Sequence, residues 1–126
     1  MCAGRYLSDM TNQAVTIDPA ADHVYRVDSF AIPDAAREEF EATMRRNLAF
    51  LHTLPGFLGH VVLERTSGPT GMNVVTIAAW ESVEAIEKAG AEVRAYYQKI
   101  GFDMPATLAR WGARAEIGAY RARTDA

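Results

Sequence analysis

The sequence has little from which to build covalent cross-links or metal sites. Its 126 residues include one cysteine, Cys2, and a single thiol cannot form an internal disulfide. Its three histidines, His23, His52 and His60, are scattered along the chain, and no combination with acidic residues has the spacing of metal ligands. We therefore expect a fold that is stabilised by packing alone, with no metal.

Positive charge and long apolar runs are also scarce. The net charge is −3, and Arg45-Arg46 is the only basic doublet, so the basic stripe of a nucleic-acid binder is missing. No stretch approaches the roughly 18 apolar residues of a membrane span, and the N-terminal segment lacks the apolar core of a signal peptide. We expect a cytoplasmic protein that binds neither nucleic acid nor membrane. Arginine outnumbers lysine by 11 to 2, which favours a GC-rich bacterial source.

The composition is that of one globular domain. Apolar residues make up 49% of the chain and charged residues 23%, which are ordinary values for a packed protein. Residues 1–22 form a polar leader, residues 122–126 a short tail, and residues 23–121 carry the periodic patterns of regular structure. We expect the single domain to span residues 23–121.

The pattern predicts four strands and three helices. A strand over 23–32 ends at Pro33, and Asp34 is the expected N-cap of a helix over 35–53. Strands over 57–65 and 72–80 flank a Gly- and Pro-containing hairpin loop. Ser82 caps a helix over 82–100, a short helix follows from Asp103 to Trp111, and the last strand covers 113–121.

This order predicts an α+β fold of ferredoxin-like topology, β-α-β-β-α-β, with an antiparallel sheet. Two helices cover one face of such a sheet, yet the third strand is apolar on both faces: Val74, Thr76, Ala78 and Trp80 alternate with Val75, Ile77 and Ala79. If the second face were exposed to solvent, polar residues would alternate with apolar ones along the strand. We therefore expect a homodimer through the sheet face; the alternative is that the leader and the short helix cover it.

Two motifs and the element order resemble the antibiotic biosynthesis monooxygenase (ABM) family. The motifs are Leu54-Pro-Gly-Phe-Leu-Gly59 after the first helix and Val75-Thr-Ile-Ala-Ala-Trp80-Glu81 at the end of the third strand. The resemblance covers residues 23–121 and implies a dimeric α/β barrel. The family includes cofactor-independent oxygenases of polycyclic phenols, haem-degrading enzymes and members without a known role.

The resemblance argues against haem. Haem-degrading members resemble one another in an Asn on the first strand, the Trp, and a haem-ligating His on the second helix. Here the first-strand position falls at Asp28 or Ser29, and the helix over 82–100 contains no histidine. We expect no haem and no other cofactor.

The quinone-forming members use an Asn and the Trp near the substrate, with Arg and Tyr to orient it. Trp80 is present, whereas the Asn is missing and Thr76 or Asn73 would replace it. The resemblance thus implies that Trp80 is catalytic and that Ser29, Thr76, Trp80 and Tyr97 bind substrate. For Trp80 and Tyr97 the alternative is plain core packing.

The remaining polar candidates are interpreted from the residues themselves. His60 on the second strand is the expected general base, or else a polar residue at the dimer face or sheet edge. His52 is expected to complement the dipole of the first helix. Arg26 and Asp28 share a strand face and are expected to form a pair that spans the dimer.

The predicted function is a cofactor-independent monooxygenase of the ABM type that acts on a small aromatic or apolar substrate. The alternative is a non-catalytic small-ligand-binding or stress-related barrel. A cavity of several hundred Å³ with convergent polar groups favours catalysis, and a filled interior favours a structural role.

Overall fold

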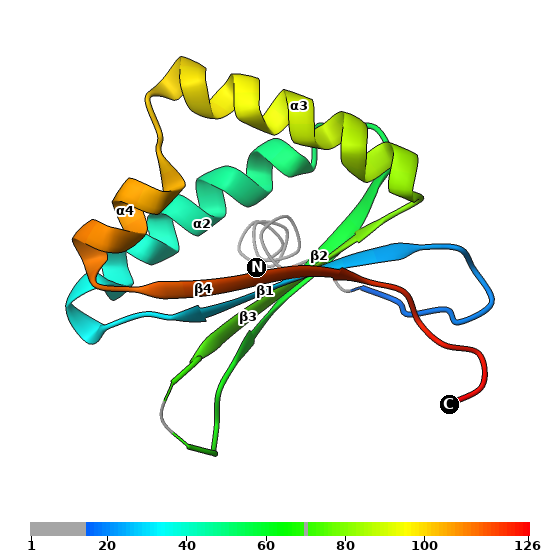
Figure 1. Ribbon diagram of the computed structural model, residues 1–126, viewed down its shortest axis with the longest axis horizontal. Coiled ribbons are helices and arrows are strands. Elements are labelled where there is room, and N and C mark those ends of the chain that lie inside the picture. The colour runs from blue at the N-terminus through cyan, green and yellow to red at the C-terminus, as the bar shows by residue number, and fades with distance from the viewer. Residues whose placement is uncertain (1–14, 70) are drawn as a thin grey trace, which may run out of the picture.

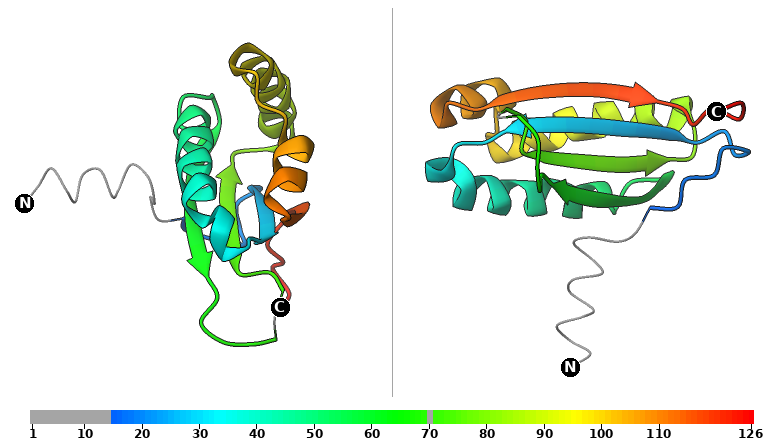
Figure 2. Two further views of the ribbon diagram at one scale, coloured as in Figure 1. Left: turned by 90° about the vertical axis from the view of Figure 1, so that its left-hand side faces the viewer. Right: turned by 90° about the horizontal axis from the view of Figure 1, so that it is seen from below.

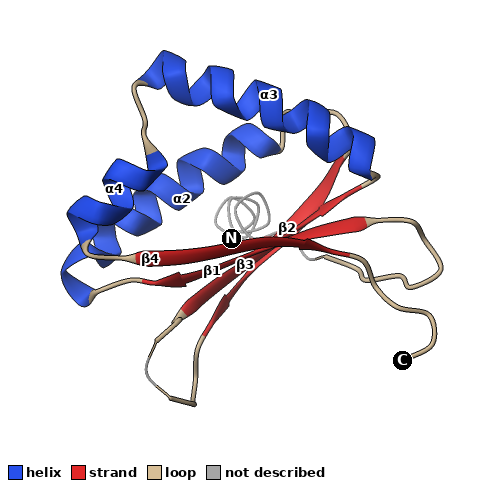
Figure 3. Cartoon of the chain, in the orientation of Figure 1, coloured by secondary structure: helices blue, strands red, loops and turns tan. Residues whose placement is uncertain are grey.

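The structure is a computed structural model that describes residues 15–69 and 71–126. The first part of the expected leader, including Cys2, lies outside the described residues. The chain forms one four-stranded sheet, and its helices lie on one side of that sheet (Figures 1 and 3). The elements are β1 (Val24–Ala31), a short 3-10 helix η1 (Asp34–Ala36), α2 (Arg37–Leu51), β2 (Phe57–Glu64), β3 (Val74–Trp80), α3 (Val83–Ile100), α4 (Met104–Trp111) and β4 (Arg114–Tyr120).

The strand order is β2-β3-β1-β4, and every neighbouring pair is antiparallel. This arrangement confirms the ferredoxin-like α+β fold. Both long helices and α4 lie behind the same face, and Figure 2 shows the other face open toward the viewer in its right-hand view. Within the described part of the chain, no helix is both long enough and apolar enough to cross a bilayer.

The strand register assigns each side chain to one of the two sheet faces. Asp28 on β1 lies opposite Thr76 on β3 and Ile117 on β4. Because side chains alternate along a strand, Asp28 shares the helix-facing side with Arg26 and Phe30. The open face carries the alternate set, which is mostly apolar: Tyr25, Val27, Ser29, Val61, Leu63, Val75, Ile77, Ala79, Glu116, Gly118 and Tyr120.

One of the two expected helix caps is present, at Ser82, and Asp103 forms a further cap that the sequence pattern had not assigned. Ser82 Oγ accepts from the backbone N–H of Ala85, and Asp103 Oδ1 accepts from that of Ala106. The expected cap at Asp34 is wrong: Pro33 precedes the first helical turn, Asp34 is the first residue of η1, and no side chain caps it. Helix formation here starts from proline's fixed φ instead of from a side-chain acceptor.

Gly56 ends the turn between α2 and β2 with a φ of +83°. A Cβ at this position would lie 2.6 Å from the Cβ of Ala85, so the residue must be glycine for α3 to approach the turn. The Gly56 carbonyl also accepts from the N–H of Glu81, 2.8 Å away. The Leu-Pro-Gly motif therefore anchors the start of α3 next to the end of β3.

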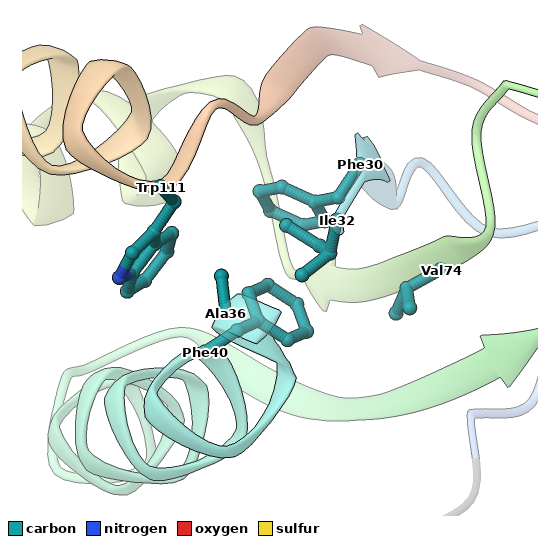
Figure 4. Close-up of a cluster of buried hydrophobic side chains, with 6 residues drawn as sticks. All are labelled: Phe30, Ile32, Ala36, Phe40, Val74 and Trp111. Atoms are coloured by element: carbon teal, nitrogen blue, oxygen red, sulfur yellow. The ribbon is translucent and has the colours of Figure 1, made fainter. Parts of the chain in front are cut away.

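The core lies at the η1 and α4 end of the molecule (Figure 4). The cluster consists of Phe30, Ile32, Ala36, Phe40, Val74 and Trp111. Phe40 makes edge contacts with Phe30 and Trp111, with ring centroids 5.2 and 6.1 Å apart. By contrast, Ala89 is the only buried residue of α3, so the apolar stripe of that helix does not pack directly on the sheet.

Candidate active site between the sheet and helix α3

A cavity of about 350 Å³ separates α3 from the helix-facing side of the sheet. It continues into a smaller space of about 90 Å³ toward α2 and α4. Six residues line both parts: Asp28, Leu48, Leu51, Thr76, Tyr97 and Met104. The two parts therefore form one site, bounded by the sheet, α2, α3 and α4.

Most of the cavity wall is apolar. Leu48 and Leu51 of α2 lie on one side, and Ile86 and Val93 of α3 on the other. These residues are the inward stripes of the two amphipathic helices. An apolar interior of this size suits a flat, largely hydrophobic molecule.

The polar groups converge on one part of the sheet. Nε of Arg26 donates to Oδ1 of Asp28 at 2.9 Å, and Thr76 is the direct cross-strand neighbour of Asp28. Burial raises the pKa of the Asp28 carboxyl above its ordinary value, and Arg26 opposes that rise. The Asp28 carboxyl therefore holds its proton more tightly than an exposed aspartic acid does.

Tyr97 projects from α3 into the same cavity. Burial raises the pKa of its hydroxyl, and the positive charge of Arg46 partly offsets that effect. The hydroxyl is consequently neutral at physiological pH and is a hydrogen-bond donor. Phe102 packs edge-on against the Tyr97 ring, 4.9 Å between centroids, and holds its orientation.

Trp80 closes the cavity at the end of β3. Its side chain is only 3% exposed, and Phe57 of β2 lies edge-on to it with centroids 5.0 Å apart. The indole is thus both part of the core and part of the cavity wall. The two interpretations of Trp80 from the sequence, packing and substrate contact, are compatible.

Three of the expected substrate-binding residues, Thr76, Trp80 and Tyr97, line the cavity. Ser29 does not: it pairs with Val75 and Glu116 on the open face of the sheet. We correct this assignment, because the alternation along β1 places Asp28 in the cavity and Ser29 on the opposite side. The Arg26–Asp28 pair likewise forms within one chain on the helix-facing side, and the expectation that it spans a dimer is wrong.

His60 is completely buried, and it is absent from the cavity wall. Its Nδ1 lies 3.0 Å from Nε2 of His52, so one imidazole donates a hydrogen bond to the other. Because His60 pairs with Ala78 on the helix-facing side, it lies neither on the open sheet face nor in position to act as the expected general base. We therefore withdraw His60 as the catalytic base.

His52 also differs from its sequence-based interpretation. Its ring is directed toward His60 and Phe57, and burial lowers its pKa. A neutral imidazole does not complement the helix dipole, so packing is the main role of His52.

Asn73 does not replace the missing asparagine of the third strand. Its Oδ1 accepts from the N–H of Ile32, and its Nδ2 donates to the Ile32 carbonyl, both at 2.9 Å. Thr76 remains the polar β3 side chain in the cavity.

Arg94 and Met104 also line the cavity, although the sequence pattern assigned neither of them to a site. Arg94 is exposed, and it reaches the cavity because of the way α3 packs over the sheet. Met104 lies on α4, and the spacing of residues in that short helix does not indicate that its side chain reaches the cavity.

A larger and more open groove of about 760 Å³ lies between the Leu54–Gly56 turn and the first half of α3. Its charged side chains are Glu81, Glu84, Lys88 and Glu92, all of them exposed. We place the candidate site in the inner cavity, since only that space combines buried polar groups with apolar walls. Across residues 15–69 and 71–126, no three His, Cys, Asp or Glu side chains are arranged to hold a metal ion.

The family model described as antibiotic biosynthesis monooxygenase matches residues 24–93. A variant of SnoaB, a cofactor-independent oxygenase from Streptomyces nogalater, is 32% identical, with a TM-score of 0.62 over 82% of this chain and 96% of that one. MhuD, a haem degrader from Mycobacterium tuberculosis, is 23% identical, with a TM-score of 0.55 over 78% and 93% of the two chains. No curated protein matches the sequence.

Proposed function

Because this chain belongs to the antibiotic biosynthesis monooxygenase family, we propose that it oxygenates a small aromatic substrate with dioxygen and without a metal or organic cofactor. The observation that carries the proposal is the cavity of about 350 Å³, whose apolar walls surround Asp28, Thr76 and Tyr97. SnoaB, the similar oxygenase, is cofactor-independent.

The proposed reaction converts an activated ring CH₂ group to a carbonyl. Loss of one proton leaves an electron pair on the ring carbon, and this carbanion reacts with dioxygen to form a hydroperoxide. Loss of water from the hydroperoxide then gives the ketone, so one O₂ is consumed and one water is released. The protein's share is to orient the ring and stabilise the anion.

The cavity residues have complementary roles in this proposal. The indole of Trp80 supports the face of the aromatic ring, as its buried position at the cavity end allows. The neutral hydroxyl of Tyr97 donates to the oxygen on which negative charge develops. Thr76 supplies a second hydroxyl on the sheet side.

Oxygen uptake with anthrone and a panel of phenols tests the proposal. We expect the wild-type chain to consume O₂ in the presence of a chelator and with no added cofactor. Trp80→Phe and Tyr97→Phe are expected to lower kcat/KM by about a hundredfold to a thousandfold, the loss typical of removing one hydrogen-bond donor that stabilises the transition state. Tyr96→Phe is the matched control, because Tyr96 stacks on Phe50 and does not line the cavity.

A non-catalytic ligand-binding role is the second candidate. It is favoured by Asn73, whose amide is engaged with Ile32 and unavailable to a substrate. Binding of anthrone, measured by equilibrium dialysis, without any oxygen uptake would support this role and contradict the oxygenase. A wild-type chain that neither binds anthrone nor consumes oxygen would contradict both candidate functions.

The open face of the sheet is the surface that we propose for homodimer formation. Val27, Val61, Val75 and Ile77 are half-buried there, and Leu63 and Tyr120 are 47% and 60% exposed. An apolar patch of this kind on a small domain is typical of an interface, and an isologous dimer buries the same patch on both copies.

A further inference from the structure

We propose that Asp28 is the proton acceptor of the oxygenation: its carboxylate removes the proton from the ring carbon with which dioxygen then reacts. This inference rests on the proposed function. It assigns a catalytic role to Asp28, which the sequence indicated only as a first-strand position of the family pattern and as the partner of Arg26.

Asp28 is the one side chain among the described residues of the cavity that is able to accept a proton. Within the described residues, four titratable side chains line it: Arg26, Asp28, Arg94 and Tyr97. Arginine stays protonated in proteins and cannot accept a proton, and burial keeps Tyr97 as the neutral phenol. His60, the base expected from the sequence, is outside the cavity wall. Asp28 alone remains as a base.

Asp28 presents its carboxylate to the cavity. Its side chain is 23% exposed, so it is accessible from the cavity although largely desolvated. Oδ1 accepts from Nε of Arg26, and in the described part of the chain Arg26 is the only side chain that hydrogen-bonds to Asp28. The second carboxylate oxygen is therefore available to a proton on the substrate.

Arg26 is the charged group in contact with Asp28. On its own strand the facing group is Arg26; β3 and β4 contribute the neutral Thr76 and Ile117. The helices contribute three neutral side chains to the cavity, Tyr97, Asn47 and Met104. They also contribute one positive charge, Arg94. Arg26 keeps the carboxylate ionised and ready to act, while burial raises its pKa and makes it a stronger base than an exposed aspartate.

In the proposed step, a proton moves from the substrate carbon to the carboxylate of Asp28. The substrate C–H bond breaks, an O–H bond forms on Asp28, and the electron pair stays on the substrate as an enolate spread over the ring and its carbonyl. The Tyr97 hydroxyl donates to the enolate oxygen. Dioxygen, the oxidant of the proposed reaction, then combines with the carbanion, and the peroxide oxygen takes the proton back from Asp28.

Hydrogen–deuterium exchange isolates this step from oxygen chemistry. Anthrone is incubated with the protein in D₂O under argon, and exchange of its CH₂ protons is followed by NMR. We expect the wild type to accelerate exchange over buffer and Asp28→Asn to lose about a hundredfold or more of that acceleration, together with a similar loss of oxygen uptake in air. Asp28→Glu, which keeps a carboxylate, is expected to restore part of the rate.

The matched control is Asp34→Asn, the same chemical change at an exposed residue of η1. It should leave exchange and uptake at wild-type rates, and equilibrium dialysis should show that Asp28→Asn still binds anthrone. Wild-type exchange rates in Asp28→Asn would overturn the inference and leave the proposed function intact. Binding of anthrone by the wild type without accelerated exchange would also overturn it. A wild type that neither binds anthrone nor consumes oxygen would refute the proposed function and the inference together.

Discussion

Arg26 and Asp28, two residues apart on β1, form an ion pair with an Nε–Oδ1 distance of 2.9 Å on the side of the sheet that faces the helices. Such a position is costly for charged groups, since each loses part of its hydration. The pair lies in the wall of a cavity that is mostly apolar. This relationship connects the fold to the proposed chemistry.

Removal of Arg26 is predicted to shift the pH dependence of activity. Arg26 opposes the effect of burial on the pKa of Asp28, so in Arg26→Gln that pKa rises further. Because Asp28 must be ionised to accept a proton, the acid limb of the kcat/KM profile is expected to move to higher pH. A profile identical to the wild type would contradict the role of Arg26. Arg45→Gln, an exposed arginine of α2, is the control and should leave the limb in place.

The contact between His52 and His60 predicts acid-sensitive stability. Burial lowers the pKa of folded His52 below 6.5, its ordinary value, so protonation favours the unfolded chain. The free energy of unfolding should therefore decline as the pH falls below about 6.5 toward the lowered value. His52→Gln keeps a hydrogen-bonding side chain without the charge and should flatten this decline in urea titrations. His23 lies outside the pair, so His23→Gln should show the same decline in the free energy of unfolding as the wild type.

Asn73 is predicted to stabilise the connection between β1 and η1. Asn73→Ala removes both hydrogen bonds to the Ile32 backbone, and we expect a loss of about 1–3 kcal/mol in the free energy of unfolding. Asn73→Asp keeps the acceptor for the Ile32 N–H, so its free energy of unfolding should fall by less than that of Asn73→Ala. Equilibrium unfolding in urea measures both variants, and equal stability of Asn73→Ala and wild type would refute the role.

The open sheet face is predicted to hold two copies of the chain together. Ile77→Lys places a charge in the centre of this face. Ile100→Lys is the control, because it places the same charge on the last residue of α3, where Ile100 is 39% exposed. We expect sedimentation to give twice 13.8 kDa for the wild type and for Ile100→Lys, and 13.8 kDa for Ile77→Lys. A wild-type chain that sediments as a monomer at micromolar concentration would contradict the dimer.

Titration with hemin is predicted to give no stoichiometric Soret band. In the described residues no histidine lines the cavity, and α3 contains none. Imidazole is one of the usual axial ligands of haem iron. A tight one-to-one complex that is degraded in the presence of a reductant would overturn this prediction and with it the preference for a cofactor-independent reaction.

The sequence by itself determined the order and type of the elements. The helix that precedes the Leu54-Pro-Gly motif, the cap at Ser82 and the short helix that ends at Trp111 are local features, and the structure confirms them. Local patterns of this kind depend on residues a few positions apart, so a single sequence contains them in full.

Only the tertiary structure decided which side chains face the cavity. Alternation places Asp28 and Ser29 on opposite faces of β1, but both faces of this sheet are apolar, so the pattern could not say which one the helices cover. The pairing of His52 with His60 and the distance of α3 from the sheet depend on contacts between segments that are separated in the sequence. Such contacts arise when the strands and helices pack together, and no local spacing encodes them.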